Sequence, residues 1–338
     1  MRHDDARGLS RAWPWVPTRR TCEDEPMTDA RLLCCGLTTW DIVQVVDRLP
    51  APDEKVQALE LRSGVGGPAA NAARTAAALG IPTTLVTALG SGAVAELARA
   101  DLIAAGVEVV DLAAGLEASP AISTVLVTRV TGQRAVVSTN AVAAPELSQP
   151  PERLLAGATA VLFDGHHLDL AIRLAHDAHE AGIVTVLDGG SWKVGEEALL
   201  DAIQLAVVSA DFVLPAFLGG RGIDTPDDVL RRIAARGPSF VARTAGAGPV
   251  YYLHGSRAPG QPALLGRIPV SAPPGRIVDT LGAGDVLHGA FAAAVAVGWT
   301  PEDALGYAME LATASVSHPG ALGWTTDAAL LARVSLRP

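Results

Sequence analysis

The segment from Asp279 to Asp285 combines three small residues with two acidic ones, and a long apolar run follows it. The small residues at 282–284 let the backbone turn sharply, and the run at 286–295 predicts a helix. Free N–H groups in the first turn of that helix would face whatever lies in front of it, which makes an anion site. Asp285 at the same place would repel a bound anion, so we interpret it as a base beside a phosphate.

The segment resembles the second signature of the ribokinase-like (PfkB) family of carbohydrate kinases, Asp-Thr-x-Gly-Ala-Gly-Asp. The resemblance implies that the N–H groups of Gly282, Ala283 and Gly284 stabilise charge on a phosphoryl group transferred from ATP. It also implies that Asp285 takes the proton from the attacking hydroxyl. The alternative is an ordinary strand-to-helix junction with an acidic first turn that suits the helix dipole. The complete motif in register favours the kinase interpretation.

A second cluster runs Gly-Val-Gly-Gly-Pro-Ala-Ala-Asn at 64–71. As Gly-x-Gly-x-x-Ala it matches a dinucleotide fingerprint, which keeps an NAD-dependent oxidoreductase as an alternative. Its context argues against that enzyme, because the first predicted core strand lies well upstream and no acidic residue ends the next strand, 83–89. As Gly-Gly-x-x-x-Asn opening an alanine-rich helix, it resembles the first signature of the same family. Gly66 and Gly67 would then approach a sugar closely, and Asn71 would bond its hydroxyls.

Acidic residues follow three other predicted strands. Asp41 stands after the first strand, where the family has an aspartate that binds two sugar hydroxyls, and a capping role is the alternative. Asp164 closes the strand at 160–163 and roughly matches a family position that touches the sugar. Asp188 closes the strand at 184–187, also at a carboxyl end, where open α/β sheets bind their ligands.

The resemblance places the nucleotide in a third region. A turn after the predicted strand at 240–243 resembles the family's Thr-x-Gly-x-x-Gly phosphate turn, with its second glycine displaced by one residue. Two residues near the end of the chain occupy places that flank the adenine in the family. The residues implied to bind nucleotide are Thr244, Gly246, Gly248, Ala312 and Ser315. Asp279 is implied to bind a monovalent cation such as K⁺.

One family feature is missing. The family's Asn-x-x-Glu, which organises Mg²⁺ and its waters, is replaced by Pro-Ala-Phe-Leu at 215–218. Since Mg²⁺ keeps much of its hydration shell, we expect ATP oxygens and waters to hold it here. A catalytically silent sugar- or nucleotide-binding regulator remains an alternative.

Strand-length apolar runs alternate with alanine-rich, helix-length stretches from about 31 to 333, the pattern of βα units around a parallel sheet. The predicted core strands are 32–36, 83–89, 160–164, 184–188, 206–213 and 240–243, and a helix is predicted at 68–79. Period-two segments within 42–62 and 121–139 predict hairpins that stand off the main body. Together with the resemblance, this pattern predicts a ribokinase-like three-layer α/β/α sandwich that spans residues 30–335. Its central sheet is expected to be mostly parallel, and the two hairpins are expected to form a small β-sheet lid.

The net charge, the length of the apolar stretches and the cysteine content limit which kinds of ligand and cellular setting fit this chain. The net charge is −10 and no basic cluster follows one face, which argues against nucleic acid as the main ligand. The apolar stretches are too short for a membrane span. Cys22, Cys34 and Cys35 are too few for a disulfide framework, so we expect a reduced, cytoplasmic setting. Residues 1–29 read as a disordered extension, and Met27 as the start of translation.

The substrate is expected to be a small sugar or sugar-like alcohol. The motifs are most similar to those of the ketohexokinase and sulfofructose kinase branch. A nucleoside kinase is the alternative within the family, and the low aromatic content of 4% offers few stacking surfaces for a base. A homodimer through the lid, as in some relatives, is a further expectation of the resemblance.

Overall fold

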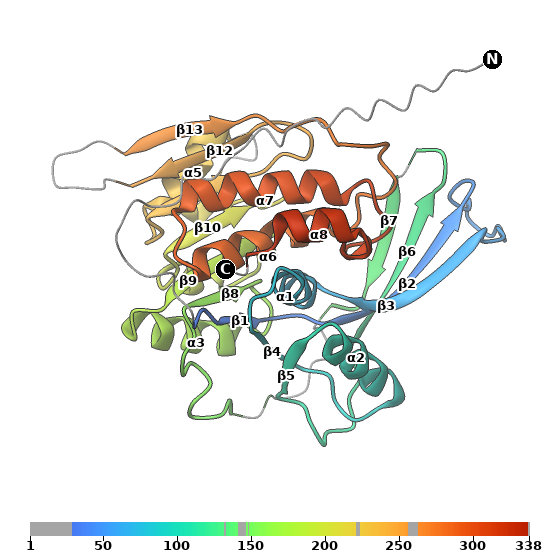
Figure 1. The fold of residues 1–338 in the computed structure, drawn as a ribbon, viewed down its shortest axis with the longest axis horizontal. Coiled ribbons are helices and arrows are strands. Elements are labelled where there is room, and N and C mark those ends of the chain that lie inside the picture. The colour runs from blue at the N-terminus through green and yellow to red at the C-terminus, as the bar shows by residue number, and fades with distance from the viewer. Residues whose placement is uncertain are drawn as a thin grey trace, which may run out of the picture.

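The computed structural model describes residues 29–131, 133–140, 147, 149–220, 224–255 and 263–336. The predictions for residues 1–28, with Cys22 and Met27, lie outside the described residues. A nine-stranded sheet runs through the molecule in the order β13-β12-β11-β10-β9-β8-β1-β4-β5 (Figure 1). Its strands are β1 Leu32–Cys35, β4 Thr83–Thr87, β5 Val107–Asp111, β8 Ala160–Phe163, β9 Val184–Gly189, β10 Leu205–Val208, β11 Phe240–Arg243, β12 Val250–His254 and β13 Leu264–Ile268. Within this sheet the seven neighbouring strands β5, β4, β1, β8, β9, β10 and β11 are parallel. Strand β12 pairs antiparallel with β11, and β13 pairs antiparallel with β12.

Helices cover both faces of this sheet, which gives the predicted three-layer sandwich. One face carries α1 Pro68–Ala78, α2 Ala93–Ala104, α6 Ala283–Ala296, α7 Pro301–Ser315 and α8 Ala328–Val334. The other carries α3 Leu168–Glu180, α4 Glu196–Leu200 and α5 Pro226–Ala234. Strand β1 shows why: Leu32 and Cys34 pack into the first layer, and Leu33 and Cys35 into the second. A strand buried on both faces reads as a continuous apolar run, as this one does.

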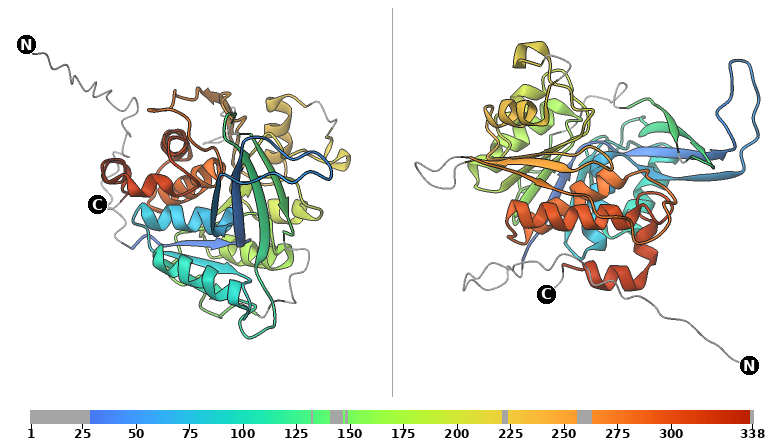
Figure 2. Two further views of the ribbon diagram at one scale, coloured as in Figure 1. Left: turned by 90° about the vertical axis from the view of Figure 1, so that its right-hand side faces the viewer. Right: turned by 90° about the horizontal axis from the view of Figure 1, so that it is seen from above.

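A smaller, four-stranded sheet stands off one end of the sandwich (Figure 2). It contains β2 Thr39–Val46, β3 Glu60–Gly66, β6 Ala121–Thr128 and β7 Arg134–Ser138, in the order β3-β2-β6-β7. Each predicted hairpin forms an antiparallel pair, and β2 and β6 join the two pairs in parallel. The two hairpins therefore build one sheet, which we call the lid. Asp41, which directly precedes the hairpin predicted within 42–62, lies within β2.

The strand predictions need correction in two respects, since one predicted strand is too long and three strands were missed. The strand predicted at 206–213 ends at Val208, because turns follow in which Phe212 N–H bonds Ser209 O at 3.2 Å. Strands β5, β12 and β13 were not predicted. The last two are half-buried strands at the antiparallel end of the sheet, with β13 at its edge. Their burial does not alternate regularly, so their sequences lack the period-two signal.

Close packing of α1 on α6 is the contact that assembles the site. A Cβ at Gly289 of α6 would lie 2.5 Å from the carbonyl oxygen and 2.8 Å from the Cα of Ala72 in α1. Glycine therefore lets the two helices approach until their backbones touch. Asn71 and Asp285 lie at the same crossing, one on each helix.

Candidate active site

The site lies at the carboxyl edge of the main sheet, where the strand order reverses. Strand β1 has β4 on one side and β8 on the other, so successive crossovers leave in opposite directions. Such a switch point is where open α/β sheets bind ligands. Gly36, Asp164 and Asp188 directly follow or end the neighbouring strands β1, β8 and β9 at this edge.

Asp285 and Asn71, far apart in sequence, meet at the α1 and α6 crossing. Nδ2 of Asn71 donates a hydrogen bond to Oδ2 of Asp285 at 2.7 Å. Burial raises the pKa of Asp285 to about 7, and Asp188 and Asp41 add to the rise, while the bond from Asn71 and the nearby His288 oppose it. Oδ1 of Asn71 is buried without a hydrogen-bond partner. An unpaired acceptor of this kind, beside a carboxylate of raised pKa, is typical of a ligand site.

The small-residue turn before α6 has the conformation that the sequence predicted. Gly282 is the N-cap residue with φ 75°, and a Cβ there would lie 2.3 Å from Cβ of Ala321, so only glycine fits. Among the described residues, the N–H groups of Gly282 and Gly284 reach no acceptor, whereas Ala283 N–H makes a long bond of 3.4 Å to Thr280 O. Open space surrounds the Cα of Gly284. The turn therefore presents free N–H donors to an approaching anion.

Asp279 ties this turn to two other segments. Its Oδ1 accepts from Leu281 N–H at 2.9 Å, and its Oδ2 accepts from Gly320 N–H at 2.9 Å. Arg62 of β3 lies 3.7 Å from the same Oδ2. Arg134 of β7 donates to the hydroxyl and carbonyl of the neighbouring Thr280 at 3.2 and 3.3 Å. Both edges of the lid thus reach the start of the anion-binding turn.

Asp41 faces the site from the lid and is held there by Thr39 and Gly66. The hydroxyl of Thr39 donates to Oδ1 of Asp41 at 2.6 Å. A Cβ at Gly66 would lie only 1.9 Å from Oδ2 of Asp41, so the glycine leaves the room that this carboxylate occupies. Burial raises the pKa of Asp41, and hydrogen bonds from Thr39 and Ser123 oppose the rise. Gly67, with φ 97°, brings the turn before α1 against the Leu37 carbonyl.

Asp164 is fully buried and organises the loops around it. Its Oδ2 accepts from Leu37 N–H at 2.8 Å and Ala69 N–H at 3.1 Å, and its Oδ1 from His166 N–H at 2.9 Å. Burial alone would raise its pKa, but His166, Lys193 and the Leu37 N–H hold it well below the usual range. Its oxygens thus already bind backbone from three segments, and the predicted sugar contact stays a prediction.

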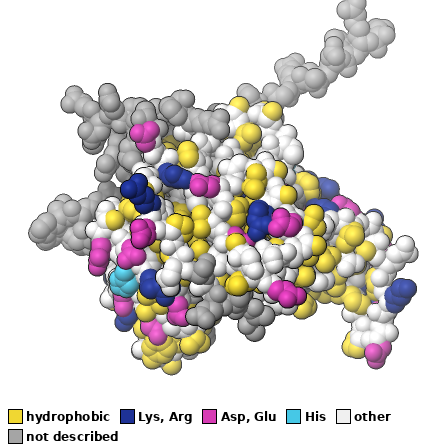
Figure 3. Space-filling model, turned by 90° about the horizontal axis from the view of Figure 1, so that it is seen from below, with side chains coloured by type: hydrophobic (Ala, Val, Ile, Leu, Met, Phe, Trp, Pro, Cys, Tyr) yellow, Lys and Arg dark blue, Asp and Glu magenta, His cyan; other side chains and the backbone are white. Residues whose placement is uncertain are grey.

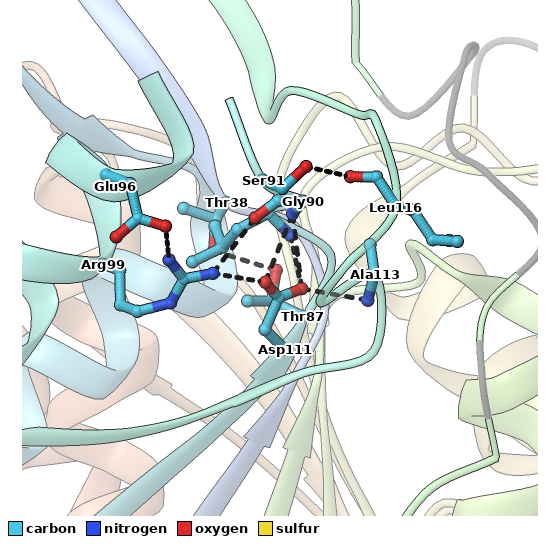
Figure 4. A network of polar contacts seen from close by, with 10 residues as sticks. Thr38, Thr87, Gly90, Ser91, Glu96, Arg99, Asp111, Ala113 and Leu116 are labelled. Carbon is cyan, nitrogen blue, oxygen red and sulfur yellow. Dashed lines mark hydrogen bonds and ion pairs between the residues drawn. The ribbon is translucent and has the colours of Figure 1, made fainter. Parts of the chain in front are cut away.

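Another carboxylate, Asp111 at the end of β5, holds together the loop after β4 and the start of the loop after β5 (Figure 4). It accepts from Arg99 at 2.7 Å and from Ala113 N–H at 3.0 Å, and it also receives the N–H of Gly90. Next to this network the hydroxyls of Thr38 and Thr87 lie 2.9 Å apart. Thr38 directly precedes β2, so its hydrogen bond with Thr87 of β4 anchors the start of the strand that carries Asp41.

Of the residues predicted to bind nucleotide, three lie in the turn after β11 and two lie on α7. Thr244 follows β11 and its N–H bonds Val208 O at 2.8 Å; Gly246 has φ 56°, and Gly248 N–H bonds Ala245 O at 2.9 Å. Both predicted α7 residues, Ala312 and Ser315, are buried, and the serine hydroxyl donates to the Ala312 carbonyl at 2.8 Å. The turn is formed as expected, and contact of these residues with a nucleotide stays a prediction.

The sequence pattern indicates no role for Gly36, and for His288 it indicates only a place one helical turn after Asp285. A Cβ at Gly36 would lie 2.0 Å from Oδ1 of Asp164. His288 is buried one turn after Asp285, with Nδ1 3.2 Å from Oδ1 of Asp188. A polar residue within the apolar run of α6 was the one available signal.

The described residues offer no ready-made metal site. None of their His, Cys, Asp and Glu side chains form a group of three or more that could hold a metal ion. At 216–218, where the family's magnesium motif would continue, a short 3₁₀ helix lies instead.

No helix in the described part of the chain has the length and apolar character to span a bilayer. The face drawn in Figure 3 intersperses acidic and basic side chains.

Comparison with known proteins identifies the relatives of this chain. The profile of the pfkB family carbohydrate kinases matches residues 29–327. An ATP-dependent ribose-1-phosphate kinase of Halopiger xanaduensis is 30% identical over 316 residues, which cover 91% of this chain and 99% of the relative. The structure of Arabidopsis thaliana ribokinase complexed with ribose and ATP superposes with a TM-score of 0.70 at 24% identity, covering 91% of this chain and 99% of that one. A mouse ketohexokinase matches only 33% of this chain and 37% of its own length at 30% identity, so the expected ketohexokinase branch has weak support.

Proposed function

The chain belongs to the pfkB family of carbohydrate kinases, and we propose how its site transfers a phosphoryl group from ATP to a sugar. Phosphorylation of a sugar with ATP is the activity that the family and the full-length relative share. The observation that carries the proposal is the 2.7 Å contact between Asn71 and Asp285 beside the free N–H groups of the α6 turn. It brings the two family signatures together as one site.

Asp285 acts as the general base. Asn71 occupies Oδ2, which leaves Oδ1 of Asp285 to accept the proton of the attacking hydroxyl. With a pKa raised to about 7, the carboxylate is ionised at slightly alkaline pH and is a stronger base than an exposed aspartate. The raised pKa therefore suits a hydroxyl substrate near neutral pH.

The turn before α6 stabilises the phosphoryl group during transfer. The free N–H groups of Gly282 and Gly284 point from the first turn of a helix whose dipole favours negative charge. Ala283 N–H joins them once its long bond to Thr280 is released. The N–H groups of Gly282 and Gly284 are free before the reaction, so these two stabilise the developing charge without reorganisation.

Asp41 and Asn71 hold the sugar. Oδ1 of Asn71 is an unpaired buried acceptor and accepts a hydrogen bond from a sugar hydroxyl. Asp41 accepts from a pair of neighbouring hydroxyls. Gly66 leaves room for the carboxylate of Asp41, Gly67 lets its turn lie against the Leu37 carbonyl, and Asp164 positions the surrounding loops.

We propose ribose, free or as its 1-phosphate, as the acceptor, because the Halopiger xanaduensis relative is an ATP-dependent ribose-1-phosphate kinase. Arg62 and Arg134 of the lid and Lys193 at the sheet edge supply positive charge for a phosphorylated acceptor. The test is ADP release from ATP with ribose, ribose 1-phosphate, fructose and adenosine as acceptors. Preferred turnover of either ribose compound supports the proposal, and exclusive turnover of adenosine or fructose contradicts it.

ATP is the phosphate donor, and Mg²⁺ enters as its complex. The described residues contain no cluster of three or more His, Cys, Asp or Glu side chains that could hold Mg²⁺, and we propose that ATP oxygens and water supply most of its ligands. Both oxygens of Asp279 accept backbone N–H groups, which fixes the loop at 320 beside the anion-binding turn. A monovalent cation at this loop remains a proposal, which K⁺ dependence of ATP affinity tests. A cytoplasmic setting agrees with ATP as donor and with the free thiols of Cys34 and Cys35.

The outer face of the lid is proposed to form a homodimer. Leu61, Ile122 and Val137 lie on the face opposite Asp41 and are 66%, 38% and 76% exposed. A single apolar sheet face of this kind is typical of an interface between copies. Light scattering should give a dimer for the native chain and a monomer for Leu61→Asp. Val130→Asp, an equally exposed site in the β6 to β7 turn, is the control, and a monomeric native chain contradicts the proposal.

A further inference from the structure

The lid strand β3 is bound by two charged side chains of the main body at Val65, close to the C-terminal end of the strand. There α1 and α2 both contact β3 (Figure 1). Nη1 of Arg74 in α1 donates to the carbonyl oxygen of Val65 at 3.0 Å, and Oδ2 of Asp101 in α2 accepts from Val65 N–H at 3.1 Å. Nη2 of Arg74 lies 3.5 Å from Oδ1 of Asp101. One ion pair thus holds both main-chain groups of one residue, and we call these three residues the Val65 clamp.

The clamp replaces a missing neighbour strand. Strand β3 lies at the edge of the lid sheet, so every second N–H and C=O group along it faces away from β2. At Val65 these groups face the body, where the residue is only 8% exposed. A buried main-chain group without a partner costs free energy, so the contacts with Arg74 and Asp101 restrict where this part of β3 can lie. The opposite charges of the pair offset each other, which allows the Arg74 side chain to be buried.

The clamp joins the two halves of the proposed sugar site. Val65 directly precedes Gly66, whose missing side chain leaves room for the carboxylate of Asp41. Arg74 follows Asn71 by three residues on α1, which is about one helical turn. The helix that carries the sugar-binding amide therefore also holds the lid strand that lies against Asp41.

We infer that Arg74 and Asp101 are positioning residues for the sugar, because they set the separation between Asp41 on the lid and Asn71 on the body. The inference rests on the proposed roles of Asp41 and Asn71 in sugar binding. The base and the anion-binding turn belong to α6, whereas the clamp acts on β3. Loosening the clamp should therefore weaken sugar binding and leave the transfer step unchanged.

The kinetic test measures KM for the acceptor and kcat at saturating ATP in two variants of Asp101. In Asp101→Ala the acceptor of the Val65 N–H is lost, so KM should rise about tenfold or more with kcat within about twofold of native. Asp101→Asn keeps a side-chain oxygen that accepts from this N–H, so its KM should stay within about threefold of native. A merely structural role predicts lower stability with native KM. Native KM in Asp101→Ala, or equal impairment of the two variants, overturns the inference.

Glu96→Ala is the matched control. Glu96 lies on the same helix, α2, and forms an ion pair with Arg99 in place of a bond to the lid strand. The control should keep the native KM for the acceptor.

A second measurement needs neither a variant nor turnover. In the native protein, amide hydrogen exchange of Val65 is compared by NMR with that of Ser63, which lies two residues earlier and directs its N–H to the same edge of β3. The Val65 amide should exchange at least about tenfold more slowly. Equal exchange rates overturn the inference even if a sugar is phosphorylated. If no acceptor is phosphorylated, the proposed function fails, while the exchange rates still decide whether the clamp exists.

Discussion

In a Gly66→Ala variant the new methyl group would collide with the carboxylate proposed to hold the sugar. The added Cβ would lie 1.9 Å from Oδ2 and 2.3 Å from Cγ of Asp41. Ordinary contact begins at 3.4 Å, so the carboxylate must move by about 1.5 Å. Such a shift breaks at least one hydrogen bond to the sugar, and a bond to a charged group contributes about 1.5 to 3 kcal/mol. Since about 1.4 kcal/mol is a factor of ten, KM for the sugar should rise about 10- to 100-fold.

The assay is ADP release at saturating ATP, with sugar affinity also measured by calorimetry. Gly64→Ala is the matched control, because it lies two residues earlier on the same face of β3 and its Cβ would have one ordinary contact, 3.5 Å to Asp101. The control should keep the native KM within about twofold, and ATP affinity should be unchanged in both variants. A Gly66→Ala enzyme with the KM of Gly64→Ala would refute the placement of Asp41 against the sugar.

Three other predictions concern the base and its support. Because the pKa of Asp285 is raised to about 7, kcat/KM should fall about tenfold per pH unit below that value. Asn71→Ala removes a hydrogen bond that lowers this pKa, so the acidic fall in kcat/KM should move to higher pH. An acidic fall near pH 4 in the native enzyme would contradict this prediction. Gly289→Ala should lower the free energy of unfolding, measured by urea denaturation, by about 1 to 3 kcal/mol and should reduce kcat. The reason is that its Cβ would lie 2.5 Å from the carbonyl oxygen of Ala72 in α1. A variant as stable as the native protein would refute the close crossing of the two helices. Gly36→Ala should also destabilise the protein, because its Cβ would displace Asp164, whose pKa is held low. The ionised Asp164 stabilises the fold above its unfolded pKa of about 3.9, and this contribution is lost as the pH falls. The difference in free energy of unfolding between Gly36→Ala and the native protein should therefore shrink in acid. A difference that stays constant with pH would contradict this prediction.

Much of the fold and the local shape of the site followed from the sequence. The segment from Asp279 into α6 is contiguous, so its small residues and apolar run predicted both turn and helix. The same holds for the glycines and helix at 64–78, because a short-range signal determines a short-range structure. The position of β3 in the lid also explains why this glycine cluster is no dinucleotide site.

The rest depends on contacts between distant residues. Asn71 and Asp285 are 214 residues apart, and their contact exists because Gly289 lets two helices touch. The pairing of the two hairpins through β2 and β6 is equally remote in sequence. His288 read as one polar residue in an apolar helix, and Asp188 beside it lies on another element, so their proximity emerged only with the packing.

The central claim is that Asp285 is the base of an ATP-dependent sugar kinase. The most direct measurement is kcat for ADP release by Asp285→Asn with the best acceptor, together with its affinity for ATP. The asparagine can still accept the hydrogen bond from Asn71 but cannot take a proton, so kcat should fall by about 10²- to 10⁴-fold with ATP affinity within about threefold of native. Turnover near the native rate in this variant would contradict the account.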